Sequence, residues 1–173
     1  CLRLTLEETC AFLQEHDCFS IITHAFPDGD TLGSGFGLCA LLRSMGKKAN
    51  VICPDPIPEK FAYLKLKDQK FSPKCTVMVD VADLKLIGRL TDEYEGKVDL
   101  CIDHHVSNIG YADRLYLDDT AAAACECIYA IACELGVEID EFVANALYTG
   151  ISTDSGCFRF TNTTARTHRI AAE

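Results

Sequence analysis

The sequence has no apolar run that approaches the length of a membrane span, and it carries no signal peptide. It also has no internal repeat, no low-complexity tract and no Gly/Ser-rich linker. Its 173 residues, 49% of them hydrophobic, are enough to bury a core without disulfide bonds. We therefore expect one globular domain over residues 1–173, located in the cytoplasm and not associated with a membrane.

The chain has no C-x-x-C pair, although it contains eleven cysteines. Cys125 and Cys127 form the only close couple, so a structural zinc site is not expected. Five cysteines lie inside apolar runs, where a thiol behaves as a small hydrophobic group: Cys39, Cys53, Cys101, Cys125 and Cys133. This placement favours packing thiols in a reducing cytoplasm over a secreted disulfide scaffold.

Basic residues are scarce, since 16 Lys and Arg stand against 26 Asp and Glu, for a net charge of -10. This balance argues against an open basic surface that binds long duplex nucleic acid. It does not exclude anionic substrates, because carboxylates can hold divalent cations that reverse the local charge. Neither a Walker-type phosphate loop nor a G-x-G-x-x-G motif occurs.

Short β-rich runs alternate with helical segments, which predicts an α/β fold with a mainly parallel sheet flanked by helices. Strands are expected at residues 19–23, 49–53, 75–80 and 98–103, with a weaker one at 115–117. Helices are expected at residues 5–16, with Thr5 and Glu8 in capping-box spacing, and at 32–45, 120–135 and 140–151. The proline-rich segment 53–58 is expected to be a loop.

Residues that can bind metal follow three of these strands. The first strand runs into His24, the third ends at Asp80, and the fourth ends at Asp103, which precedes His104 and His105. In open α/β sheets, ligands bind beyond the carboxyl ends of the strands. The sequence therefore predicts the functional site at this edge of the sheet.

The segment from His24 to Asp30 places an imidazole and the carboxylates of Asp28 and Asp30 on a turn before a helix. Such a turn also caps helices, and for this segment alone the functional and capping interpretations stand about equal. Asp80 ends an apolar strand, where an unpaired carboxylate is costly and a metal ion would remove that cost. Asp83 is expected to cap a following helix.

Adjacent side chains at a strand end point in different directions. We therefore expect one imidazole of His104 and His105 to bind metal and the other to face the substrate, while Asp103 fixes an imidazole tautomer. An exposed polar strand end is the alternative. Asp154 follows an apolar helix, and Arg159 beyond it could contact phosphate oxygens, although an ordinary surface arginine is slightly preferred.

Together these segments offer six candidate metal ligands: His24, Asp28, Asp30, Asp80, His104 and Asp154. Hard oxygen ligands with a few imidazoles suit manganese or magnesium, with other first-row metals as alternatives. So many carboxylates around one point repel each other unless cations neutralise them. Two metal ions about 3.5–4 Å apart form the standard clamp for displacement at phosphorus. The residues thus predict a metal-dependent phosphoesterase.

The four segments, in this order, resemble the motifs of the DHH phosphoesterase superfamily. The amino-acid sequences of these segments are similar to those of the bacterial oligoribonuclease and 3'-phosphoadenosine 5'-phosphate phosphatase branch, the nanoRNase type. The similarity rests on THAFPDGDTLGS, VDVADLKLIGRL, IDHHVSN and LYTGISTDSGCFRFTNTTARTHRIAAE, and it runs from about residue 20 to the last residue.

The resemblance implies two manganese ions, with His24 and Asp28 on one, Asp30, His104 and Asp154 on the other, and Asp80 bridging them. It also implies roles beyond metal binding for three residues. His105 would touch the scissile phosphate or its leaving group, Asp103 would orient the histidine pair, and Arg159 would contact the substrate.

Members of the superfamily continue into a second, DHHA1-type domain, whereas this chain ends at Glu173, where we expect a connecting helix to begin. The chain is therefore expected to be the metal-binding half of a longer enzyme. The expected substrates are short single-stranded oligoribonucleotides, a nucleotide 3',5'-bisphosphate or dinucleotides. A family II inorganic pyrophosphatase-like hydrolase and a non-catalytic metal-binding fragment stay open as alternatives. The oligomeric state is also open, a homodimer included.

Overall fold

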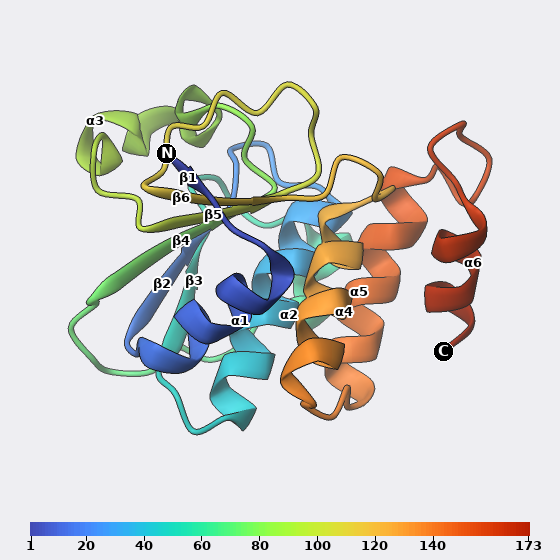
Figure 1. Cartoon of the computed structure of the whole chain (residues 1–173), viewed down its shortest axis with the longest axis horizontal. Helices are drawn as coiled ribbons and strands as arrows, with labels where there is room; N and C mark the ends of the chain where they lie inside the picture. Colours follow the sequence, from blue (N-terminus) through green and yellow to red (C-terminus); the bar gives the residue numbers. More distant parts are fainter.

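Six strands form one sheet in the order β1-β6-β5-β4-β2-β3, and every adjacent pair runs parallel. The computed structural model describes residues 1–173 (Figure 1). The strands are β1 Leu2–Arg3, β2 Phe19–Ile22, β3 Ala49–Ile52, β4 Cys75–Val79, β5 Leu100–Asp103 and β6 Arg114–Leu117. The predicted α/β fold with a parallel sheet is confirmed. The edge strand β1 was not predicted, because two residues are too short to show a pattern.

Six α-helices and two 3-10 helices complete the chain. They are α1 Leu6–Glu15, α2 Gly29–Ser44, η1 Glu59–Leu64, η2 Leu84–Leu90, α3 Thr91–Tyr94, α4 Ala124–Leu135, α5 Glu141–Asp154 and α6 Ala165–Ala172. The Thr5–Glu8 capping box is present at the start of α1, and Asp83 caps η2 through the amide of Lys85. Both capping predictions are confirmed. None of the helices combines the length and the apolar composition that a membrane-spanning helix needs.

Several helix boundaries differ from the prediction. α2 begins at Gly29, three residues earlier than expected, because the Asp28 side chain caps its first turn. α4 begins at Ala124 rather than at residue 120, because the Asp30 carboxylate accepts hydrogen bonds from its first amides. α5 extends to Asp154, so this residue ends the helix instead of following it. The last helix, α6, precedes Glu173 and was not predicted.

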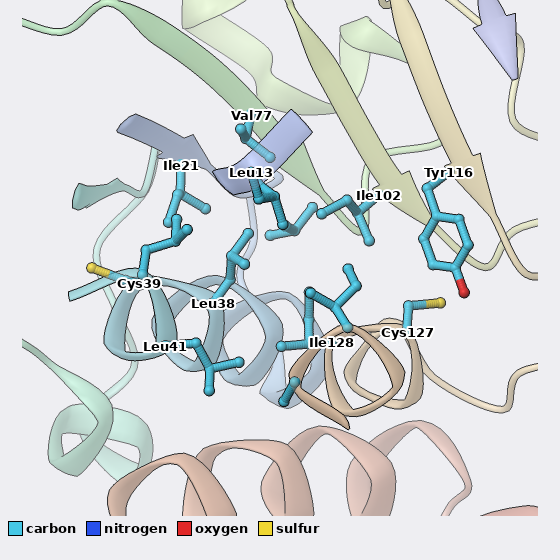
Figure 2. Close-up of a cluster of buried hydrophobic side chains, with 14 of the residues drawn as sticks. Leu13, Ile21, Leu38, Cys39, Leu41, Val77, Ile102, Tyr116, Cys127 and Ile128 are labelled. Carbon is cyan, nitrogen blue, oxygen red and sulfur yellow. The ribbon is translucent and has the colours of Figure 1, made fainter. Parts of the chain in front are cut away.

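Apolar side chains cover both faces of the sheet. Successive residues of a strand point to opposite faces, so Ile21 and Ile102 join the larger core cluster while Ile22 and Cys101 join a smaller one. Figure 2 shows the larger cluster, in which strand residues such as Val77 meet residues of α2 and α4. A buried sheet of this kind explains why the strands read as continuous apolar runs.

The helices form two layers on one side of the sheet. α1, α2 and α4 lie next to the sheet, and α5 packs against α2 and α4 (Figures 1 and 2). The 3-10 helix η2 packs on the opposite face, where Ile87 is buried. The position of α5 matters for function, because its last residue is a candidate metal ligand.

The eleven cysteines are free thiols. Cys39, Cys101 and Cys125 are buried, as predicted for packing residues. The prediction was wrong for Cys133, which is exposed on α4, and only half right for Cys53, which is partly buried. An apolar run in the sequence does not by itself decide which side of a helix faces the core.

Candidate metal centre

The six predicted ligands converge at the carboxyl edge of the sheet. Their ligating atoms form overlapping groups in which all atoms lie within 4.8 Å of one another. One group is His24, Asp28 and Asp80, another is Asp30, His104 and Asp154, and a third joins Asp80 to Asp103, His104 and His105. The groups share Asp80 and His104, so they form one continuous cluster.

Asp80 lies at the centre of this cluster because of the strand order. β4 pairs with β2 on one side and with β5 on the other, so the residue after β4 stands between His24 and His104. Its Oδ2 is 3.5 Å from Nε2 of His24, and its Oδ1 is 3.6 Å from Nε2 of His104. The residue is 3% exposed and its backbone is left-handed, with φ 60°. Such strained backbone is concentrated at functional sites.

Both histidines present the same nitrogen to the cluster. Nδ1 of His24 is 2.7 Å from the carbonyl oxygen of Ala25, and Nδ1 of His104 is 3.2 Å from that of Ala121. A carbonyl oxygen can only accept a hydrogen bond, so Nδ1 carries the proton in each ring. Nε2 of each ring therefore faces Asp80, and it offers a lone pair to a metal ion once its own proton has left.

Asp30 occupies the first turn of α2 and reaches across to α4. Its Oδ2 accepts from the amide of Ala124 at 2.7 Å, and its Oδ1 accepts from the amide of Cys125 at 3.0 Å. Oδ2 also lies 3.6 Å from Nε2 of His104. A helix N-terminus favours a carboxylate, so the α4 amides offset part of the cost of burying Asp30.

Glycines allow α5 to approach α2 closely enough to add Asp154 to the cluster. A Cβ atom on Gly33 would stand 2.4 Å from the carbonyl oxygen of Ala146, and one on Gly150 would stand 2.7 Å from Oδ1 of Asp30. Any side chain at these positions would separate the helices. With glycine there, Oδ2 of Asp154 lies 3.6 Å from Nε2 of His104.

Asp28 caps α2 and also faces the candidate metal centre. Its Oδ1 accepts from the amides of Asp30 and Thr31 at the start of α2. Its Oδ2 faces Nε2 of His24 at 3.7 Å. Capping uses one carboxylate oxygen and leaves the other for the cluster.

Asp103 is fully buried and holds the two-histidine segment. Its Oδ1 accepts from the amide of His104 at 2.7 Å and from Nδ1 of His105 at 2.8 Å. Its Oδ2 accepts from Nδ2 of Asn108 at 2.7 Å. Asn108 was missed at the sequence level, where an amide side chain five residues after Asp103 was the only signal. The pairing leaves Nε2 of His105, a residue that is partly exposed, pointing away from Asp103.

Arg159 lies outside this network. Its Nε donates to the carbonyl oxygen of Gly156 at 2.9 Å, and the side chain is exposed with no ion pair to the carboxylates. Its predicted contact with the substrate stays a prediction.

The buried charges neutralise one another. Burial opposes a charged imidazole, but the Asp80 carboxylate outweighs it and raises the pKa of His24 to about 9. Asp80 and Asp30 likewise outweigh burial and raise the pKa of His104 to about 10. Burial and repulsion from Asp80 raise the pKa of Asp30 to about 8. Burial alone would raise the pKa of Asp80, yet the two imidazoles lower it.

The donor set fits a divalent cation. Oδ1 of Asp80 and Nε2 of His104 are both buried and have no hydrogen-bond partner. Their separation of 3.6 Å is too long for a hydrogen bond. Atoms that bind one ion at about 2.0–2.2 Å lie about 3–3.5 Å from each other, which is close to the spacing here. A metal ion would satisfy both orphaned atoms at once.

The sequence matches the family model described as "DHH family, N-terminal domain" over residues 19–151. The chain belongs to the DHH family. This match begins at β2 and ends within α5, so it includes five of the six predicted ligands, with Asp154 just beyond it.

Named relatives of this DHH chain are hydrolases. It is 35% identical over 161 residues to the bifunctional oligoribonuclease and PAP phosphatase NrnA of Thermus thermophilus, covering 88% of this chain and 48% of that protein. It is 26% identical over 167 residues to a probable manganese-dependent inorganic pyrophosphatase of Streptococcus thermophilus, covering 88% of this chain and 53% of that protein. The DHH chain thus spans about half the length of the curated relatives it matches.

A solved structure shares the fold. An exopolyphosphatase-related protein from Bacteroides fragilis superposes with a TM-score of 0.87 at 23% identity, covering 96% of this chain and 54% of that one. At this identity the likeness shows the DHH fold alone.

Proposed function

We propose that this chain is the metal-binding domain of a phosphoesterase that hydrolyses short oligoribonucleotides, a nucleotide 3',5'-bisphosphate or dinucleotides with two divalent metal ions. The observation that carries the proposal is the position of Asp80 between two imidazoles, each of which directs Nε2 toward it at 3.5–3.6 Å. The family match and the relative named as an oligoribonuclease and PAP phosphatase support the substrate class.

We assign the ligands by the groups that the geometry forms. His24 and Asp28 would hold one ion, and His104, Asp30 and Asp154 would hold the other. Asp80 would contribute to both sites, because each of its oxygens faces a different histidine. Manganese is the proposed metal, since the relative from Streptococcus thermophilus is named as manganese-dependent. When bound, the ions would supply an activated water and neutralise charge on the phosphate.

The remaining residues position and protonate the substrate. Asp103 orients His105 through Nδ1, so that Nε2 of His105 is free to donate to a phosphate or leaving-group oxygen. The Asp103 hydrogen bond raises the pKa of His105, which favours the protonated, donating form of the ring. Arg159 is the proposed contact for a phosphate oxygen farther from the ions.

Two other functions stay candidates. The 26% identity to a named pyrophosphatase favours inorganic pyrophosphate as an alternative substrate. A metal-binding fragment without activity of its own is the second alternative, because the relatives are about twice as long.

The test is hydrolysis by the purified chain with manganese and four substrates: pApA, 3'-phosphoadenosine 5'-phosphate, cyclic di-AMP and pyrophosphate. Asp80→Asn removes the bridging charge and should abolish both turnover and manganese binding measured by calorimetry. Asp83→Asn is the matched control, since Asp83 caps η2 and belongs to none of the clustered groups.

Each outcome decides between the candidates. Release of mononucleotide or phosphate from the nucleotide substrates, lost in Asp80→Asn alone, supports the proposal. Turnover of pyrophosphate alone would move the chain to the alternative substrate. Manganese binding without any turnover would identify the metal-binding fragment, and no manganese binding would refute the metal centre.

A further inference from the structure

We propose that Phe26 forms a stacking platform for the nucleobase of the substrate, beside the metal centre. This inference rests on the proposed function, because it concerns the nucleotide that the centre would bind. Phe26 stands two residues after His24 and two before Asp28, in the loop between β2 and α2. A ring at this place would adjoin any group attached to a phosphate at the centre.

The side chain of Phe26 is exposed in a way that its local structure does not explain. The residue is 87% exposed, the largest value among the exposed large hydrophobic residues. Its backbone is left-handed, with φ 56°, a conformation that bulky residues rarely adopt. Packing does not compensate for this strain, because the ring is in solvent. Strain without a structural gain is typical of functional loops.

Neighbouring loops hold the Phe26 backbone firmly. The amide of Phe26 donates to Oδ2 of Asp55 at 2.9 Å, and the amide of Ala25 donates to the carbonyl oxygen of Leu86 at 2.8 Å. The Asp55 loop is held in turn, since the Arg89 guanidinium donates twice to the carbonyl oxygen of Pro54, at 3.0 and 2.6 Å. The ring is therefore carried by a fixed support, which reduces the entropy lost when a ligand binds.

Other exposed apolar residues lie around the same edge. Of the eight large hydrophobic residues that are exposed, four lie in the loops after β2, β5 and α5, and a fifth lies in η2 after β4: Phe26, Val106, Ile109, Phe160 and Leu86. The loops after β2 and β5 also carry His24, His104 and His105 of the cluster. An anionic centre surrounded by an apolar rim fits a ligand that has both a phosphate and a flat, uncharged ring.

Phe26 is the rim residue best suited to a base. A base stacks on an aromatic ring regardless of its hydrogen-bonding pattern, and one such contact strengthens binding about tenfold. Phenylalanine carries no charge, so stacking is not opposed by the carboxylates nearby. The other aromatic rim residue, Phe160, is already placed over Gly156, where a Cβ atom would stand 2.5 Å from its ring.

The experiment compares the binding of AMP and ribose 5-phosphate to the chain with manganese present, by calorimetry. AMP and ribose 5-phosphate carry the same phosphate group, so the difference between their affinities measures the contribution of the base. We expect the chain to bind AMP about tenfold more tightly than ribose 5-phosphate. Phe26→Asn removes the ring but tolerates a left-handed backbone, and it should abolish this preference. Phe26→Tyr should keep it.

Ile109→Asn is the matched control, because it removes another exposed apolar rim residue and should leave the preference unchanged. A preference for AMP that survives in Phe26→Asn would overturn the inference. Equal binding of both ligands by the unmodified chain would also overturn it, while leaving the metal centre intact. Failure to bind either phosphate, with manganese bound, would refute the nucleotide function itself and the stacking with it.

Discussion

At the scale of single residues, two aspartates of the centre each make two kinds of contact. Asp28 caps α2 with one oxygen and faces His24 with the other. Asp30 holds the start of α4 and approaches His104 at 3.6 Å. The hydrogen bonds fix these two carboxylates before any ion arrives, so they need little reorganisation when a metal binds.

Asp103→Asn should weaken manganese binding or turnover about 10- to 100-fold, the usual effect of losing an outer-shell carboxylate. Asp103 accepts a hydrogen bond from His105 with one carboxylate oxygen and from Asn108 with the other. The amide of asparagine has only one acceptor oxygen, so it cannot make both. Manganese affinity and the pH profile of turnover are the measurements. Asp99→Asn, which changes an acid at the opposite end of β5, should leave both unchanged. Equal effects of the two substitutions would contradict the role of Asp103.

Stability without metal should fall as pH rises from about 6.5 to 10. The folded pKa values of His24 and His104, about 9 and 10, exceed the unfolded value of 6.5, so the folded chain holds more protons in this range. This stabilisation is complete below pH 6.5 and is lost as pH passes through the folded values. The raised pKa of Asp30, about 8, acts in the same direction. Thermal unfolding with a chelator, across this range, measures the effect.

Manganese should oppose this loss of stability at higher pH, because a metal ion displaces the protons from the imidazoles of His24 and His104. The rise in melting temperature on adding manganese should therefore grow between pH 6.5 and 8.5. A rise that is independent of pH would show that neither histidine binds the metal.

At the scale of elements, the contact between α2 and α5 decides whether Asp154 reaches the centre. The small residues along α2 and at Gly150 let the two helices pack closely. The position of the Asp154 side chain therefore depends on how closely the backbones of α2 and α5 approach. A single added methyl group between the helices is enough to disturb this packing.

Gly150→Ala should therefore damage both stability and metal binding. The new Cβ would stand 2.2 Å from Sγ of Cys125 and 2.7 Å from Oδ1 of Asp30, so α5 must move. We expect a loss of about 1–3 kcal/mol in the free energy of unfolding, as for other overpacked cores. Manganese affinity should fall as well. Ala144→Ser, which adds one atom on the exposed face of α5, is the control, and urea unfolding with calorimetry measures both effects.

At the scale of the whole molecule, one arginine of α6 forms ion pairs with two acids of the domain. Nη1 of Arg166 is 2.6 Å from Oδ2 of Asp118, which follows β6, and its Nε is 3.1 Å from Oε2 of Glu126 on α4. Glu126 is fully buried, and neither of its carboxylate oxygens has a hydrogen-bond partner. The arginine is the only cation paired with this buried acid.

Arg166→Met should destabilise the chain by about 2–4 kcal/mol, because it leaves the Glu126 charge buried and unpaired. This loss of stability is smaller than the loss expected on breaking a fully buried ion pair, because the Arg166 side chain is 32% exposed. Glu126→Gln in the same chain should recover most of the loss. Urea unfolding of the two single variants and the double variant measures this coupling, and purely additive losses would contradict it.

Local patterns in the sequence were enough to predict the parallel α/β fold, the four segments that carry the site and the capping of α1 and η2. These features follow from local patterns: apolar runs predict buried strands, and particular residue types suit caps or metal ions. Tertiary structure decided the rest. Only the strand order places Asp80 between His24 and His104, and only the packing of α5 on α2 brings in Asp154. These arrangements depend on contacts between segments far apart in the chain, and no local pattern records them.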